Sequence, residues 1–321
     1  MTEIADKESS SGQQTYPLRG VFPVFQTPFL EDDSIDYATL EGELHWLFDQ
    51  RADGIVMAMV SETLRLSEAE RRQLAEFACR TAESRGERNG GAVVISVGAE
   101  STQVAMALAR HAEAAGADAV MAIPPISVAL GEAELKGYYE SILNAITLPV
   151  IVQDASGYVG RPMSIAMQAA LFAEYGERVL FKPEATPIGP RLSALRDATI
   201  NAAQGPAPIF EGSGGIALVD SYRRGIVGTM PGADLIDAMV ALWRALQAGD
   251  TARIYALSLP ISALVAMQNS LDAFIAVEKY LLVKRGIFKN SLMRGPVGYT
   301  LDAETRSEVD RLFALLQAVL A

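Results

Sequence analysis

One lysine of this sequence has the context of a reactive amine. Lys182 follows the apolar run Val179-Leu180-Phe181, so a strand should carry its side chain toward an apolar pocket. Burial disfavours the charged ammonium and favours the neutral amine, which attacks a ketone to form a Schiff base. The protonated imine then withdraws electrons from the neighbouring carbon. From position alone, a solvent-facing lysine paired with Glu184 is the somewhat stronger interpretation.

Polar or glycine residues follow several other apolar runs, where further strands should end. They are Thr27, Ser61, Gln153, Gly212 and Ser213. Ser61 can offer its hydroxyl or backbone N–H to a substrate carboxylate, or it can belong to a capping arrangement ahead of the next helix. The turn that contains Gly212 and Ser213 can enclose a ligand, although glycine-rich turns are more often only turns.

The elements that carry these residues alternate along the chain. Eight short apolar runs are each followed by a segment with helical spacing, and Ser67-Glu68-Ala69-Glu70 has the form of a capping box at the start of one such segment. Uninterrupted apolar runs are typical of parallel strands buried on both faces. The alternation therefore predicts an α/β fold, a (β/α)8 TIM barrel. A doubly wound open sheet is the alternative, but no glycine-rich phosphate loop follows the first run.

The chain is expected to divide into three parts. Residues 1–16 are polar, lack the apolar stretch of a secretory signal, and are predicted to form a flexible tail. Residues 17–232 form the predicted barrel. From 233 to 321 the pattern is purely helical, and no linker rich in Gly, Pro or Ser precedes it. We expect this C-terminal helical extension to pack on the barrel.

Composition excludes several classes of function. The 321 residues include 27 Lys and Arg against 39 Asp and Glu, a net charge of −12, which argues against nucleic-acid or anionic-membrane partners. The single cysteine, Cys79, excludes an internal disulfide and a multi-cysteine metal site. His45 and His111 fall in predicted helices, so no metal site is expected. No apolar run is long enough for a membrane span, and the protein is predicted to be cytoplasmic.

The strand-end residues resemble those of the dihydrodipicolinate synthase/N-acetylneuraminate lyase family of Schiff-base-forming (β/α)8 lyases. The resemblance covers roughly residues 19–321 and is carried by four segments: residues 20–29 (GVFPVFQTPF), 62–71, 181–186 (FKPEAT) and 225–231 (GIVGTMP). It implies that Lys182 is the Schiff-base lysine and that the covalent imine replaces any cofactor. It also implies a 2-keto acid substrate and a homo-oligomer, commonly a tetramer.

Several positions depart from the family's pattern. The family usually has Gly-Thr-Thr-Gly-Glu after the second strand, whereas this chain has Ala58-Met-Val60-Ser61-Glu62. Gln153 stands where the family has a proton-relaying tyrosine, and Tyr158 stands where the synthases have an arginine. The interface tyrosine expected near Pro125 is also missing. Lysine-biosynthetic synthase activity is therefore disfavoured.

The same segments are similar to the sugar-acid dehydratases of this family, which act on 2-keto-3-deoxy pentonates such as L-2-keto-3-deoxyarabonate. Gln153 cannot titrate, so it can only orient a group, and Glu184 or a bound water would serve as acid or base. The expected catalytic residues are Lys182, Gln153 and Glu184, and the expected substrate-binding residues are Ser61, Val60, Thr27, Gly212 and Ser213. Dehydration of a 2-keto-3-deoxy sugar acid is the main hypothesis. A pyruvate-dependent aldolase or synthase-like condensation, and a non-catalytic barrel that binds a small keto acid, remain alternatives.

Overall fold

The structure is a computed structural model that describes residues 18–85, 91–157 and 159–321. The expected tail at residues 1–16 and Tyr158 lie outside the described residues. In the described part, eight strands alternate with helices. The strands are β1 (Gly20–Val21), β2 (Gly54–Met57), β3 (Ala92–Ser96), β4 (Ala119–Ala122), β5 (Val150–Asp154), β6 (Val179–Pro183), β7 (Phe210–Glu211) and β8 (Gly228–Thr229).

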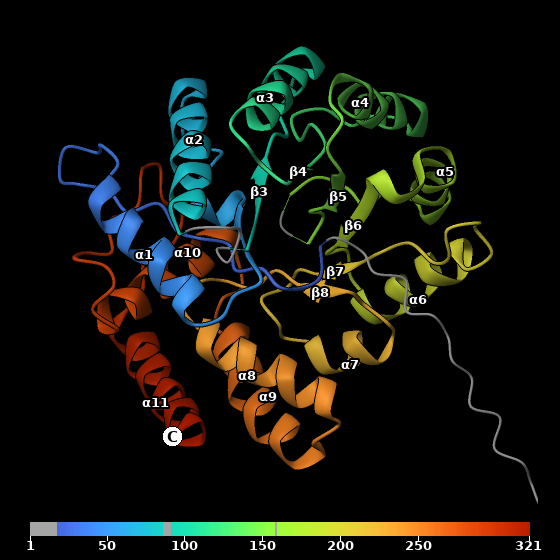
Figure 1. The fold of residues 1–321 in the computed structure, drawn as a ribbon. Coiled ribbons are helices and arrows are strands. Elements are labelled where there is room, and N and C mark those ends of the chain that lie inside the picture. Colours follow the sequence, from blue (N-terminus) through green and yellow to red (C-terminus); the bar gives the residue numbers. More distant parts are fainter. Residues whose placement is uncertain (1–17, 86–90, 158) are drawn as a thin grey trace, which may run out of the picture.

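The helices surround the strands in a ring (Figure 1). They are α1 (Tyr37–Asp49), α2 (Glu68–Ser84), α3 (Thr102–Ala114), α4 (Glu132–Ala145), α5 (Ile165–Tyr175), α6 (Ile188–Thr199), α7 (Leu218–Arg223) and α8 (Ile236–Ala248). Two short 3₁₀ turns, η1 (Met59–Ser61) and η2 (Gly176–Arg178), lie among them. The capping box at Ser67 is confirmed, because its hydroxyl accepts from the Glu70 amide and the Glu70 carboxylate accepts from the Ser67 amide.

The strands close into a parallel barrel. Their order is β2-β3-β4-β5-β6 in one sheet and β1-β8-β7 in the other, and every pair is parallel. Parallel bridges join the two sheets at Val24 with Val56 and at Phe181 with Ile209. The predicted (β/α)8 barrel is thus confirmed.

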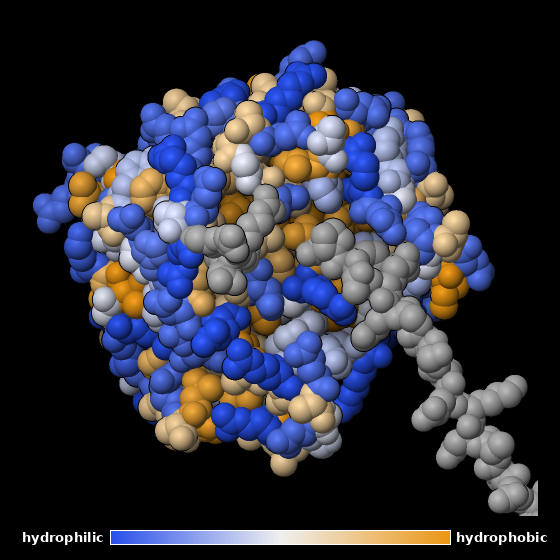
Figure 2. Space-filling view, in the orientation of Figure 1, coloured by the Kyte–Doolittle hydropathy of each residue, from blue (hydrophilic) through white to orange (hydrophobic). Residues whose placement is uncertain are grey.

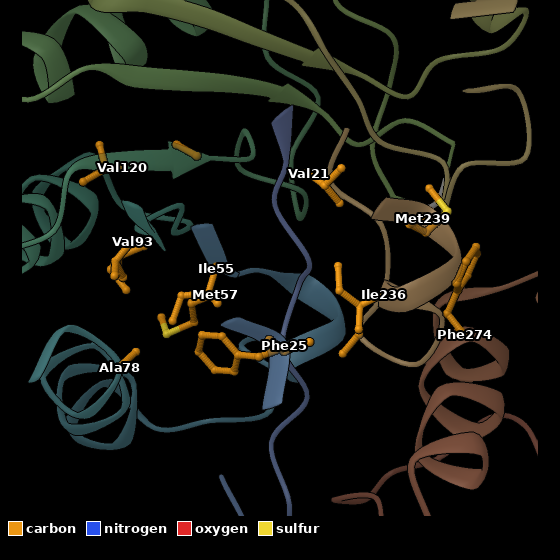
Figure 3. Packing of buried hydrophobic residues seen from close by; sticks show 14 of the residues in the cluster. Val21, Phe25, Ile55, Met57, Ala78, Val93, Val120, Ile236, Met239 and Phe274 are labelled. Atoms are coloured by element: carbon orange, nitrogen blue, oxygen red, sulfur yellow. The ribbon is translucent and has the colours of Figure 1, made fainter. Parts of the chain in front are cut away.

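Two apolar layers hold the barrel together. Within β2, Val56 belongs to the inner cluster with Phe22 and Leu180, whereas Ile55 belongs to the outer cluster between strands and helices. Side chains alternate between the faces of a strand, so both faces of β2 are buried. Figure 3 shows part of the outer cluster, in which Phe25, Ile55 and Met57 lie close together.

Three further helices follow α8 and complete the chain. They are α9 (Thr251–Ala266), α10 (Leu271–Lys284) and α11 (Ala303–Leu320). α8 contacts both β1 and α9, and α9 contacts α11, so the C-terminal helices continue directly from the barrel. α10 contacts η1, which follows β2, and this places α10 at the end of the barrel where the strands terminate.

The exterior is largely polar on the side drawn in Figure 2, where hydrophilic side chains surround smaller apolar patches. Among the described residues, no helix is both long enough and apolar enough to cross a membrane.

Candidate active site

Lys182 and Gln153 are brought side by side by the register of two strands. They are Cα partners in the parallel pair of β5 and β6, so their side chains leave the sheet on the same face. Only 3% of Lys182 and 1% of Gln153 is exposed. The solvent-facing interpretation of Lys182 is therefore wrong. The physical reason is that a side chain at the end of a barrel strand points into the enclosed mouth rather than outward.

Glu184 connects these two residues. Lys182 Nζ lies 2.8 Å from Glu184 Oε1, and Gln153 Nε2 donates to Glu184 Oε2 at 2.6 Å. Lys182 and Glu184 are two positions apart on an extended segment, which places them on one face. The side-chain oxygen of Gln153, Oε1, is buried and has no hydrogen-bond partner among the described residues. One carboxylate thus bridges an amine and an amide whose oxygen remains free to accept a hydrogen bond.

These three side chains line one cavity at the strand ends. The remaining lining comes from the segment after β1, the η1 turn and the residue before it, the loops after β7 and β8, and α10. It consists of Val24, Ala58, Met59, Val60, Gly212, Gly214, Met230, Pro231, Gly232, Leu271, Phe274 and Glu278. Lys182, Glu184 and Glu278 are the charged side chains in this lining. The cavity therefore combines one amine and two carboxyl groups within mostly apolar walls.

Gly212 makes room for Glu184. A Cβ atom at this position would lie 2.7 Å from both Cγ and Oε1 of Glu184. That distance is too short for non-bonded atoms, so a side chain at position 212 would displace the carboxylate. The glycine expected to hold substrate thus also allows Glu184 to reach Lys182.

Ser61 and Thr27 are buried side by side without lining the cavity. The Ser61 hydroxyl donates to the Phe25 carbonyl at 2.5 Å and accepts from the Ala58 amide at 3.1 Å, and the Ser61 amide donates to the Ala58 carbonyl at 3.0 Å. Thr27 Oγ1 donates to the Ser61 carbonyl at 2.7 Å. These hydrogen bonds thus fix the η1 turn against the segment after β1.

The η1 turn presents other groups to the cavity. Met59 and Val60 line it, and their backbone N–H groups have no acceptor in the described part of the chain. Unpaired amides are normal for the first residues of a helical turn, and they attract anions. Val60 therefore reaches the cavity as expected, while the amides available there are those of Met59 and Val60 rather than of Ser61.

Ser213, in the loop after β7, and Glu211, which ends β7, are not among the residues that line the cavity. The Ser213 amide donates to Glu211 Oε1 at 3.1 Å, and Thr229 donates to Glu211 Oε2 at 2.7 Å. Burial raises the pKa of Glu211, and the hydrogen bonds and Lys182 partly offset that rise. Glu211 thus acts here as a hydrogen-bonded acceptor that shapes the loop after β7.

Asp154, next to Gln153, has a structural role. Its side chain accepts from the amides of Ser156 at 3.2 Å and Met163 at 3.0 Å, and Arg191 lies 3.5 Å away. The strand alternation sends Asp154 to the opposite face from Gln153. Of the two polar residues that end β5, Asp154 therefore holds the following loop and Gln153 lines the cavity.

Sequence reasoning missed the contribution of α10. Leu271, Phe274 and Glu278 line the cavity, and their spacing of three and four residues places them on one helical face. A signal was present, because Glu278 and Lys279 interrupt an otherwise apolar helix. Periodicity alone did not indicate which element that face would cover.

Comparison with known proteins settles the family. Residues 17–316 match the model of the dihydrodipicolinate synthetase family. The chain belongs to the dihydrodipicolinate synthetase family. It is thereby a member of a family of lyases and aldolases, as the resemblance in the sequence predicted.

Two curated relatives illustrate the range of this family. The chain is 28% identical over 298 residues to the L-2-keto-3-deoxyarabonate dehydratase of Azospirillum brasilense, covering 91% of this chain and 92% of that protein. It is 25% identical over 301 residues to the Escherichia coli (strain K12) protein YjhH, named a probable 2-dehydro-3-deoxy-D-pentonate aldolase, covering 93% and 96%. Relatives at similar identity thus carry names for two different reactions.

Solved structures agree with the fold. The dihydrodipicolinate synthase of Rhodopseudomonas palustris superposes with a TM-score of 0.84 at 25% identity, covering 94% of this chain and 99% of that one. YagE of E. coli K12, solved with pyruvate, has a TM-score of 0.84 at 22% identity, covering 93% and 98%.

Proposed function

We propose that this protein dehydrates a 2-keto-3-deoxy sugar acid through a Schiff base on Lys182. The amine of Lys182 adds to the C2 ketone, and loss of one water gives the imine. The imine makes the C3 protons acidic; a base removes one, and the C4 hydroxyl leaves with a proton as a second water. Hydrolysis of the imine consumes one water, so the net reaction loses a single water. In a five-carbon substrate with a C5 hydroxyl, proton shifts from C5 to C3 and from that hydroxyl to C4 turn the unsaturated acid into its isomer, the semialdehyde.

One observation supports dehydration in particular: Glu184 is held between Lys182 and Gln153 at 2.8 and 2.6 Å. Cleavage of the C3–C4 bond requires a base for the C4 hydroxyl, and the amide of Gln153 cannot accept that proton. Elimination instead requires a group that removes a proton at C3 and returns one to the leaving hydroxyl. We assign both proton transfers to Glu184 and its orientation to Gln153, and their hydrogen bond supports this assignment.

We infer that the substrate carboxylate binds at the η1 turn. Met59 and Val60 line the same cavity as Lys182, and their amides have no acceptor among the residues that the structure describes. Backbone N–H groups at the start of a helical turn bind carboxylates without requiring a cation. This arrangement would replace the hydroxyl groups that the family usually has in this segment.

The proposal needs no cofactor, because the imine of Lys182 supplies the electron sink. Assembly as a homo-oligomer remains a prediction from the resemblance, and a cytoplasmic location remains a prediction from the sequence composition.

Borohydride trapping tests the covalent step. Incubation with pyruvate or L-2-keto-3-deoxyarabonate and borohydride should add the reduced adduct to Lys182, as measured by peptide mass spectrometry. Lys182→Ala and Lys182→Arg should trap nothing, since neither offers a neutral primary amine. Lys136→Ala is the matched control, because Lys136 pairs with Glu140 and Glu174 on the surface, away from the cavity.

Product analysis separates the reactions. Dehydration of L-2-keto-3-deoxyarabonate yields α-ketoglutarate semialdehyde without loss of carbon, whereas an aldolase releases pyruvate. Pyruvate as the main product would contradict the dehydratase proposal. A chain that traps no keto acid and turns none over would indicate a non-catalytic barrel.

A further inference from the structure

A fourth polar side chain of the cavity comes from the C-terminal helices. Glu278 of α10 lines the cavity with Lys182 and Glu184, and only 2% of the residue is exposed. Its Oε2 accepts a hydrogen bond from Gln26 Nε2, which follows β1. The mechanism proposed above makes no use of this carboxyl group.

The orientation of Glu278 is fixed by its neighbour. Lys279 forms a fully buried ion pair with Glu62, donates to the Leu292 carbonyl at 2.7 Å, and lies 4.6 Å from the centre of the Phe29 ring. Consecutive residues of a helix point about 100° apart. Lys279 therefore anchors α10 to the barrel rim while Glu278 is directed into the cavity.

Three glycines from the loops after β7 and β8 line the same cavity as Lys182 and Glu278. Around the barrel, β6 is followed by β7, β8 and β1, and the loops after β7 and β8 contribute Gly212, Gly214 and Gly232 to the lining. A Cβ atom at Gly232 would lie 2.3 Å from Glu278 Oε1. The missing side chain at position 232 thus gives the Glu278 carboxyl its place in the lining of the cavity that also contains Lys182.

We propose that Glu278 contacts the end of the substrate remote from Lys182 and selects keto acids whose far end is an uncharged hydroxyl group over those that carry a second carboxylate. This proposal rests on the proposed function, because it assumes a keto acid bound to Lys182.

The charge around Glu278 explains the selection. Burial raises the pKa of Glu278 well above its ordinary value, and the nearby carboxyls of Asp234 and Glu43 raise it further, against the opposing hydrogen bond from Gln26. A neutral carboxylic acid offers one O–H donor and one carbonyl acceptor, which suits a hydroxyl group. A second substrate carboxylate would instead lie against the Glu278 carboxyl. It would lose its hydration without gaining a cation, because Lys182, the cation of the described lining, is taken up by the imine.

The apparent affinities of two five-carbon keto acids, with pyruvate as the reference, test the proposal. Half-saturation of borohydride trapping is measured for L-2-keto-3-deoxyarabonate, which ends in a hydroxyl, for 2-oxoglutarate, which ends in a carboxylate, and for pyruvate, which has no far end. The wild type should favour the hydroxylated acid over 2-oxoglutarate by about tenfold or more. Glu278→Leu should lose most of this preference, and Glu278→Gln, which keeps a neutral donor and acceptor, should retain it.

Gly232→Ala is a second variant, which keeps the Glu278 side chain but changes its surroundings. Its methyl group should displace the Glu278 carboxyl and weaken the hydroxylated acid relative to pyruvate, by about tenfold. Thermal melting of every variant reports whether it has folded. If Glu278→Leu does not fold, Gly232→Ala still tests the role of Glu278.

The outcomes separate the two proposals. A wild type that traps no keto acid overturns the proposed function and this inference together. A wild type that traps keto acids but binds 2-oxoglutarate as well as the hydroxylated acid overturns only the role of Glu278. The same conclusion holds if the preference survives in folded Glu278→Leu or Gly232→Ala.

Discussion

The ion pair between Lys279 and Glu62 should carry much of the attachment of α10 to the barrel. Both side chains have no exposed surface. Burial lowers the pKa of Lys279, and the adjacent Glu62 carboxylate opposes that effect. We consider Lys279→Met, which keeps the length of the side chain and removes the charge, together with Glu62→Gln and the double variant.

The structure sets the expected cost. Removing one partner of a buried pair typically costs about 3–5 kcal/mol, because the other charge is left uncompensated. Glu62 would keep the Arg294 amide at 2.9 Å and Arg65 at 3.7 Å, so the lower end, about 3 kcal/mol, is expected for Lys279→Met. In the double variant neither charge remains, so its loss should fall well short of the sum of the single losses.

Urea unfolding followed by circular dichroism measures these free energies. Lys284→Met is the matched control on the same helix, because Lys284 pairs with Asp310 at 2.9 Å while 39% and 38% of the two side chains are exposed. An exposed pair of this kind is worth at most about 1 kcal/mol. The reasoning is refuted if Lys279→Met costs no more than Lys284→Met, or if the two single losses add in the double variant.

Three further predictions concern other parts of the molecule. Burial raises the pKa of Asp234 to about 7, so the folded protein keeps a proton that the unfolded chain releases above about pH 4. The free energy of unfolding should therefore fall as the pH rises from about 4 to about 7. Asp234→Asn should make urea midpoints less dependent on pH between about 5 and 8, and an unchanged slope would contradict this. Burial raises the pKa of Cys79 to about 12, so this thiol should react with a disulfide reagent only when urea unfolds the chain; rapid labelling of the native protein would show that it is accessible. Gly212→Ala should displace Glu184 and slow imine trapping by about tenfold or more, whereas Gly42→Ala, where nothing lies within 4 Å, should not; equal rates would mean that Glu184 does not assist Lys182.

Much of the fold was accessible from the sequence because strand and helix patterns are local. The apolar run before Lys182 predicts a buried strand, and the structure places Lys182 at the end of β6. The capping box at Ser67 was predicted and found. Repetition of such local signals is sufficient to indicate a barrel.

The details of the site were less accessible because they depend on competition between partners. A hydroxyl at Ser61 suggests a substrate contact, yet this hydroxyl bonds to the Phe25 carbonyl and the Ala58 amide. No sequence pattern reports which acceptor lies nearest once the chain has folded.

The sequence by itself indicated the barrel, a lysine at the end of an apolar strand, and a glutamine where the family has a tyrosine. Only the tertiary structure decided that α10 covers the strand ends and brings Glu278 to Gln26, 252 residues away along the chain. Periodicity specifies which face of a helix is buried. The partner of that face is decided by long-range packing, in which Lys279 and Glu62 satisfy each other's charge.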